Sequence, residues 1–217
     1  MSIPGALARR HAWAVRSPWL RLLTALTRAL LALAFLPSGF AKLGGHPFTV
    51  LPVSTPVGLF FAGFFQAQGY YRFVGAAQVL AALLLLVPAT APLGAAIYFP
   101  IILNIFVITV AVDFGNTRII AGLMALATVY LLLWDLEKWK ALLPGFDRPA
   151  AGAWPGRVSW WTTASLAGAA AVGMLGVLQA HQAWLRHESV GAPLLVTLAG
   201  VTLAVSVAVG HLRTTRP

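Results

Sequence analysis

Cysteine is absent from this chain of 217 residues, and acidic side chains are scarce: five Asp and Glu stand against 15 Lys and Arg. Without cysteine the chain can form no disulfide, thiol nucleophile or thiolate-bound metal. Charged residues make up 9% of the sequence, compared with about 25% in soluble globular domains. Because 59% of the residues are hydrophobic, the composition predicts an integral membrane protein.

The common signatures of catalysis and cofactor binding are also missing. The sequence has no HExxH, no P-loop, no GxGxxG between a strand and a helix, and no nucleophile elbow. No two carboxylates lie inside predicted spans for acid–base work. The histidines fall in loops or near span ends, which leaves at most a single haem ligand near an interface. We therefore expect no catalytic residue, no metal site and no intrinsic cofactor.

What the sequence does contain is a series of long apolar runs, which predict an all-α polytopic transmembrane bundle. The predicted spans cover residues 20–42, 72–88, 92–112, 118–136, 159–180 and 191–211. The turn between the second and third spans is short, so these two are expected to form an antiparallel hairpin.

An aromatic segment at residues 55–68 is too short to cross a membrane. Thr55 followed by Pro56 is a helix-start signal, with a capping hydroxyl and then proline at the first helical position. We expect an interfacial or re-entrant half-helix here. Its phenylalanines fit two roles, an interfacial aromatic belt or a lid over the mouth of the bundle.

Proline and glycine between residues 144 and 158 predict a linker. This divides the chain into a basic N-terminus (1–19), a four-helix module (20–143), a two-helix appendage (159–211) and a short tail (212–217). Loop Lys and Arg number ten on the side of the N-terminus and four on the other side, so both termini are predicted to be cytoplasmic.

The cations flank apolar runs and form no basic patch with exposed aromatics, which argues against nucleic acid and favours contact with the lipid bilayer. Small residues recur every four positions in the last two spans. We expect these ridges to pack on each other or between copies in a homo-oligomer. The ridges are Ser165, Ala169 and Gly173, and Thr202, Ser206 and Gly210.

The first span carries a polar stripe. Arg28 and Lys42 are 14 residues apart, about 21 Å along a helix, and Ser38 lies on the same side. Because charge near hydrocarbon is costly, this side is expected to face the bundle interior and to bind a ligand. The alternative is that both cations snorkel to the membrane interface.

Three further polar side chains complete the candidate ligand site. Gln78 lies in the second span, Asn104 in the third span, and Tyr71 just before the second. With Arg28, Ser38 and Lys42 they could line a pocket for a lipophilic molecule, a quinone or a lipid. Alternatively, the two amides satisfy each other or a carbonyl freed by Pro100.

Two charged groups are expected to be structural. Asp113 closes the third span and is predicted to pair with Arg118. The residues from Asp135 to Lys140 are predicted to be a solvated helix end.

Residues 20–143 resemble the DoxX-like family of small bacterial membrane proteins. The resemblance rests on Ser38-Gly-Phe-Ala-Lys42-Leu at the end of the first span, and on Gly75-Ala-Ala-Gln78 followed by an apolar run to Pro88. It implies a four-helix module in the bacterial cytoplasmic (inner) membrane and a link to respiratory or protective redox complexes. This chain has Gln78 where members commonly have glutamate, and it adds two spans.

Together these features predict a non-catalytic subunit that binds a lipophilic molecule and works with a membrane redox partner. Two other functions remain open. One is a structural or assembly scaffold, in which the polar residues only hold helices together. The other is a transporter of small solutes or lipids.

Overall fold

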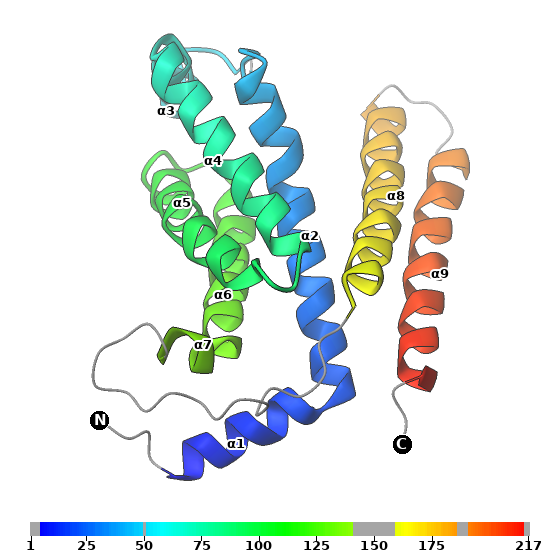
Figure 1. The fold of residues 1–217 in the computed structure, drawn as a ribbon. Helices are drawn as coiled ribbons and strands as arrows, with labels where there is room; N and C mark the ends of the chain where they lie inside the picture. Colours follow the sequence, from blue (N-terminus) through cyan, green and yellow to red (C-terminus); the bar gives the residue numbers. More distant parts are fainter. Residues whose placement is uncertain (1–4, 50, 141–158, 186–190, 215–217) are drawn as a thin grey trace. The chain divides into compact units, whose positions relative to one another are not determined.

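The computed structural model describes residues 5–49, 51–140, 159–185 and 191–214, which form helices and no strands (Figure 1). Their bounds are α1 Gly5–Arg16, α2 Pro18–Leu43, α3 Pro56–Gln66, α4 Gln68–Leu86, α5 Ala91–Ala111, α6 Thr117–Trp134, α7 Leu136–Lys140, α8 Trp160–Leu185 and α9 Gly191–Thr214. Two compact units are present, Met1–Leu33 with Lys140–Pro217 and Ala34–Trp139, and each is described by itself.

The all-α architecture is confirmed. Within the described residues, α2, α4, α5, α6 and residues 194–211 of α9 are long and apolar enough to cross a membrane. The predicted span 159–180 lies in α8, whose side chains are described only in part. Helix α1 was not predicted, because its arginines interrupt any apolar run. The predicted linker at 144–158 lies outside the described residues.

The inward stripe of α2 is visible in its burial pattern. Thr24, Leu31 and Phe35 are buried, whereas Leu30 and Phe40 on other sides of the helix are exposed. Helix α2 continues unbroken through Pro37. Arg28 and Lys42, which helical periodicity places on the inward side of α2, are also buried, and Ser38 is half-buried.

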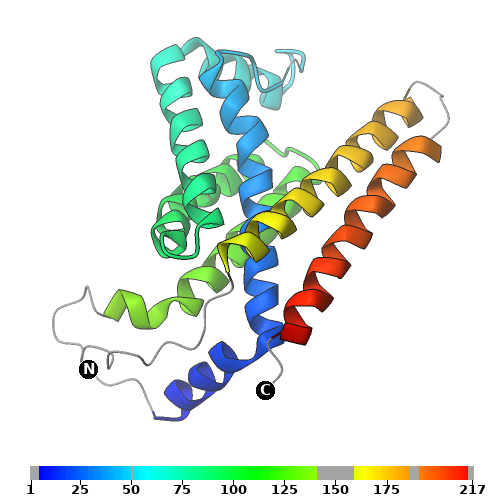
Figure 2. The same ribbon diagram turned by 45° about the vertical axis from the view of Figure 1, so that its right-hand side comes forward.

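In the unit Ala34–Trp139, α4 and α5 form the predicted hairpin (Figures 1 and 2). Gly94 lets the two helices approach closely, since a Cβ there would lie 2.7 Å from the backbone nitrogen of Leu85. Across the unit, the Phe35 ring stacks on Tyr98 of α5 with 3.6 Å between ring centroids. These apolar contacts and buried alanines on α4 and α5 form the core of the unit.

Helix α3 begins as the sequence predicts. The Thr55 hydroxyl accepts a hydrogen bond from the backbone N–H of Gly58 at 3.1 Å, and Pro56 takes the first helical position. The same hydroxyl donates to the carbonyl of Pro52 at 2.8 Å. Thr55 therefore caps α3 and also fixes the loop that leads into it.

Replacing Thr55 by alanine is expected to loosen the start of α3 by about 1 kcal/mol, the usual value of a lost N-cap. Hydrogen–deuterium exchange of peptides covering residues 56–66 should become several-fold faster. Ser54→Ala is the matched control, because the neighbouring Ser54 is exposed and caps nothing. Equal exchange in both variants would contradict a capping role.

In the other unit, α8 and α9 run antiparallel side by side (Figure 2). A Cβ at Gly200 would lie 2.3 Å from the nitrogen of Gly173, so the two backbones touch there. Two members of the predicted α8 ridge, Ala169 and Gly173, thus pack on α9. The predicted α9 ridge does not face α8, because Thr202, Ser206 and Gly210 are exposed.

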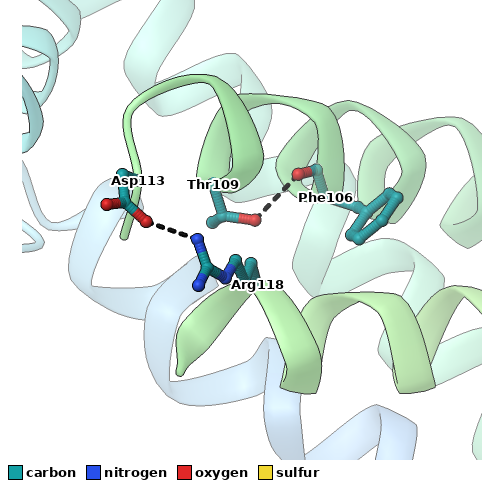
Figure 3. A network of polar contacts seen from close by, with 4 residues as sticks. All are labelled: Phe106, Thr109, Asp113 and Arg118. Atoms are coloured by element: carbon teal, nitrogen blue, oxygen red, sulfur yellow. Dashed lines mark hydrogen bonds and ion pairs between the residues drawn. The ribbon is translucent and has the colours of Figure 1, made fainter. Parts of the chain in front are cut away.

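The two structural predictions for charged groups have different outcomes. Arg118 donates to Asp113 in an exposed ion pair at the turn between α5 and α6, while the Thr109 hydroxyl donates to the Phe106 carbonyl at 2.8 Å (Figure 3). The solvated helix end is wrong for Asp135. That carboxylate, at the C-cap of α6, is 1% exposed and accepts a hydrogen bond from Lys138 at 2.6 Å.

Candidate functional site

Two glycines bring α2 and α4 into backbone contact near the end of α2. A Cβ on Gly75 would lie 2.7 Å from the Cβ of Lys42 and 2.8 Å from the carbonyl oxygen of Gly39. A Cβ on Gly39 would lie 2.8 Å from a methyl carbon of Val79. Any larger residue would separate the helices, so this crossing decides which side chains meet.

The side chains next to the crossing form a connected polar cluster. The Ser38 hydroxyl donates to Oε1 of Gln78 at 3.3 Å, joining α2 to α4. The Lys42 ammonium donates to the Ser38 carbonyl at 3.2 Å and to the Ser38 hydroxyl at 3.3 Å. Lys42 is 5% exposed and Gln78 is 1% exposed. The cluster therefore lies inside the unit, against the snorkelling alternative for Lys42.

Aromatic rings cover the ammonium group of Lys42. Its Nζ lies 4.6 Å from the ring centroid of Phe48 and 5.9 Å from that of Tyr71, both within cation–π range. The Tyr71 hydroxyl donates to the backbone carbonyl of His46 at 2.9 Å, which fixes the ring. The rings supply partial negative charge to the cation, but they carry no net charge.

Helix α3 extends this aromatic cover. Phe64 lies edge-on to Tyr71 with 4.9 Å between centroids, and Phe61 contacts Phe48 at 5.4 Å. Phe61 also contacts Phe114 at 5.7 Å, in the turn between α5 and α6. The half-helix thus packs through its rings on Phe48, Tyr71 and Phe114, an arrangement that fits both an aromatic belt and a lid.

The charge of Lys42 is not balanced by an acidic side chain in the described part of the chain. In this unit Asp113 pairs with Arg118 and Asp135 pairs with Lys138. A second cation lies close by: a Cβ on Gly45 would be 3.0 Å from Nη2 of Arg72. Gly45 has a φ of +70°, which glycine adopts freely. The turn after α2 therefore lies next to two cations.

The structure brings together four of the six side chains predicted for the site. They are Ser38, Lys42, Tyr71 and Gln78. Arg28 is 7% exposed but belongs to the unit that contains Met1–Leu33. Asn104 is exposed on α5 and does not join the cluster. The alternative in which Gln78 pairs with Asn104 is wrong, because Gln78 accepts its hydrogen bond from Ser38 and Asn104 is exposed.

Several contributors were missed by sequence reasoning. Phe48 and the His46 carbonyl come from a loop with no regular spacing, so no periodic signal points to them. Gly39 follows Ser38 directly, and Gly75 lies three residues before Gln78. A search for small residues in adjacent spans would have found both glycines. Arg72 entered the sequence analysis only as one of the four loop cations on the side opposite the N-terminus.

The cluster presents polar groups and aromatic rings side by side. Lys42, Ser38 and Gln78 together offer N–H, O–H and amide groups to an oxygen-bearing ligand head, and the surrounding rings suit an apolar body. Within the residues that the structure describes, no group of three or more His, Cys, Asp or Glu side chains could hold a metal ion.

By the length and composition of its described helices, the chain is a multi-pass membrane protein. No family model matches it, and no solved structure matches it. A stretch of 74 residues is 42% identical to the "Uncharacterized protein YwoB" of Bacillus subtilis (strain 168), covering 34% of this chain. The match spans about half of that relative, 47% of its length.

Proposed function

We propose that the chain is a non-catalytic membrane subunit that binds a lipophilic small molecule at the Lys42 cluster, defined as Ser38, Lys42, Tyr71 and Gln78. The polar head of the ligand would bond to Lys42 and Gln78, and its apolar body would lie among the rings. A quinone is the first ligand to test, and a membrane redox system is the proposed partner. The resemblance of residues 20–143 to the DoxX-like family stays a prediction and agrees with this proposal.

One observation carries the proposal: a lysine 5% exposed lies beside a buried amide and under aromatic rings. Burying a charge and an amide costs free energy unless they are paired or functional. Helices could be joined in this core by apolar side chains at lower cost. A polar cluster of this kind is therefore better explained by a ligand than by helix packing alone.

The test is organic extraction and mass spectrometry of the protein purified in mild detergent. We expect a stoichiometric quinone or lipid in the wild type and at most a tenth of that amount in Gln78→Leu. Asn104→Leu is the matched control, since it removes an exposed amide from a neighbouring helix. Wild-type protein with no bound molecule, or unchanged occupancy in Gln78→Leu, would overturn the proposal.

A scaffold is the second candidate, and the exposed face of α9 favours it. Only 6% of the apolar stretch Leu194–His211 is buried, and Thr202, Ser206 and Gly210 lie on its exposed surface. Small-residue ridges allow close approach of another membrane helix. A scaffold would retain a membrane polypeptide through purification, and Ser206→Leu should release it.

A further inference from the structure

We infer that the ligand head held at Lys42 carries negative charge, so that the ligand is an acidic amphiphile. The inference rests on the proposed function and narrows its ligand from a quinone or lipid to a molecule with an acidic head. Its basis is the charge balance around Lys42. The group inferred to bind there is an anionic oxygen, which could belong to a carboxylate or to a lipid phosphate.

The first argument is the set of partners that Lys42 has. Its ammonium group has three N–H donors, and both acceptors at hydrogen-bond distance come from Ser38. Both are neutral, as are the rings of Phe48 and Tyr71. A neutral carbonyl ligand would add one hydrogen bond and leave the buried charge uncompensated. An anionic oxygen would accept a stronger, charge-assisted bond and balance the charge.

The second argument is independent and concerns Arg72. Its guanidinium lies against Gly45, in the turn that follows Lys42. Within the described residues it forms no ion pair with a carboxylate, and its side chain is exposed. Two cations beside one turn repel each other and attract an anion, and the exposed one can steer an acidic head toward the buried one.

The third argument is that Gln78, the amide next to Ser38 in the cluster, carries no charge. It is 1% exposed and accepts a hydrogen bond from the Ser38 hydroxyl, which also accepts one from Lys42. Because an amide stands there, the positive charge of the cluster is left for the ligand. The surrounding rings of Phe48, Phe61 and Phe64 suit the hydrocarbon chain that follows the head group.

The experiment compares ligands of equal chain length and different charge. Full-length protein, delipidated in dodecyl maltoside, is titrated with radiolabelled oleate and, separately, with oleyl alcohol and decylubiquinone. We expect oleate to bind at least tenfold more tightly than oleyl alcohol. Lys42→Met should reduce this preference to within about threefold, whereas Arg118→Met, which removes an exposed cation of the same unit, should keep it.

Competition identifies the source of the anion. Displacement of oleate by phosphatidylglycerol but not by phosphatidylcholine would support the inference with a phospholipid as ligand, and displacement by neither would support it with a free acid. Oleyl alcohol or decylubiquinone binding as tightly as oleate to wild-type protein would overturn the inference and leave the proposed function intact. Binding of none of the probes would overturn both.

Discussion

Replacing Gly75 by alanine is expected to lower the Tm of the protein in mild detergent by about 2–12 °C. The added Cβ would lie 2.7 Å from the Cβ of Lys42 and 2.9 Å from the backbone nitrogen of Leu43. Two of the three nearest atoms belong to backbone, so the helices must separate. Overpacking of this kind costs about 1–3 kcal/mol, and each kcal/mol shifts Tm by roughly 2–4 °C in a chain of this size.

The control for Gly75 is another glycine of the same helix. A Cβ on Gly69 would meet nothing within 4 Å. Gly69→Ala should therefore leave Tm unchanged or raise it, because alanine favours a helix over glycine by up to about 1 kcal/mol. A lower Tm for Gly75→Ala and a higher Tm for Gly69→Ala would establish the crossing of α2 and α4. A Gly75→Ala protein as stable as the wild type would contradict it.

Gly75→Ala should also weaken the ligand site, because the crossing sets the distance between Ser38 and Gln78. We expect less bound lipophile in this variant at a temperature well below its Tm, measured by extraction as above. If the variant bound as much lipophile as the wild type at that temperature, the crossing would matter only for stability.

Replacing Lys42 by methionine is expected to remove the bound lipophile while leaving the Tm of the delipidated protein unchanged or higher. Methionine has about the length of lysine and fits among apolar and aromatic groups. The charge is lost from a site that is 5% exposed, and its hydrogen-bond partner Ser38 is neutral and keeps its bond to Gln78. Removing a buried charge without stranding an opposite one is neutral or stabilising by up to a few kcal/mol.

The same substitution at Lys138 provides the contrast. Lys138 contacts the carboxylate of Asp135, which is 1% exposed, so Lys138→Met takes a partner from a buried charge. We expect Lys138→Met to lower Tm and to leave the lipophile bound. If Lys42→Met lowered the Tm of the delipidated protein as much as Lys138→Met does, Lys42 would be a structural residue, and the proposed function would lose its main support.

Much of the fold could be predicted from the sequence because membrane helices are built from local properties. Long apolar runs, the Thr55-Pro56 start of α3 and the short turn before α5 each depend on neighbouring residues only. Helix α1 was missed because a short basic helix has no apolar run to reveal it.

The candidate site could be predicted only in part. Periodicity placed Ser38 and Lys42 on one side of α2, because a helix repeats every 3.6 residues. Periodicity does not decide how a neighbouring helix is rotated. For that reason Gln78 and Asn104, two amides in adjacent spans, appeared equivalent, although Gln78 is buried and Asn104 is exposed.

By itself, therefore, the sequence determined the class of protein, its apolar helices and the buried stripe on α2, all of which follow from composition and helical repeat. Only the tertiary structure decided that α2 and α4 cross at Gly39 and Gly75, that Phe48 from a loop covers Lys42, and that Asn104 lies apart. These contacts join residues distant in the chain, and they depend on backbone approach and helix rotation, which no local pattern specifies.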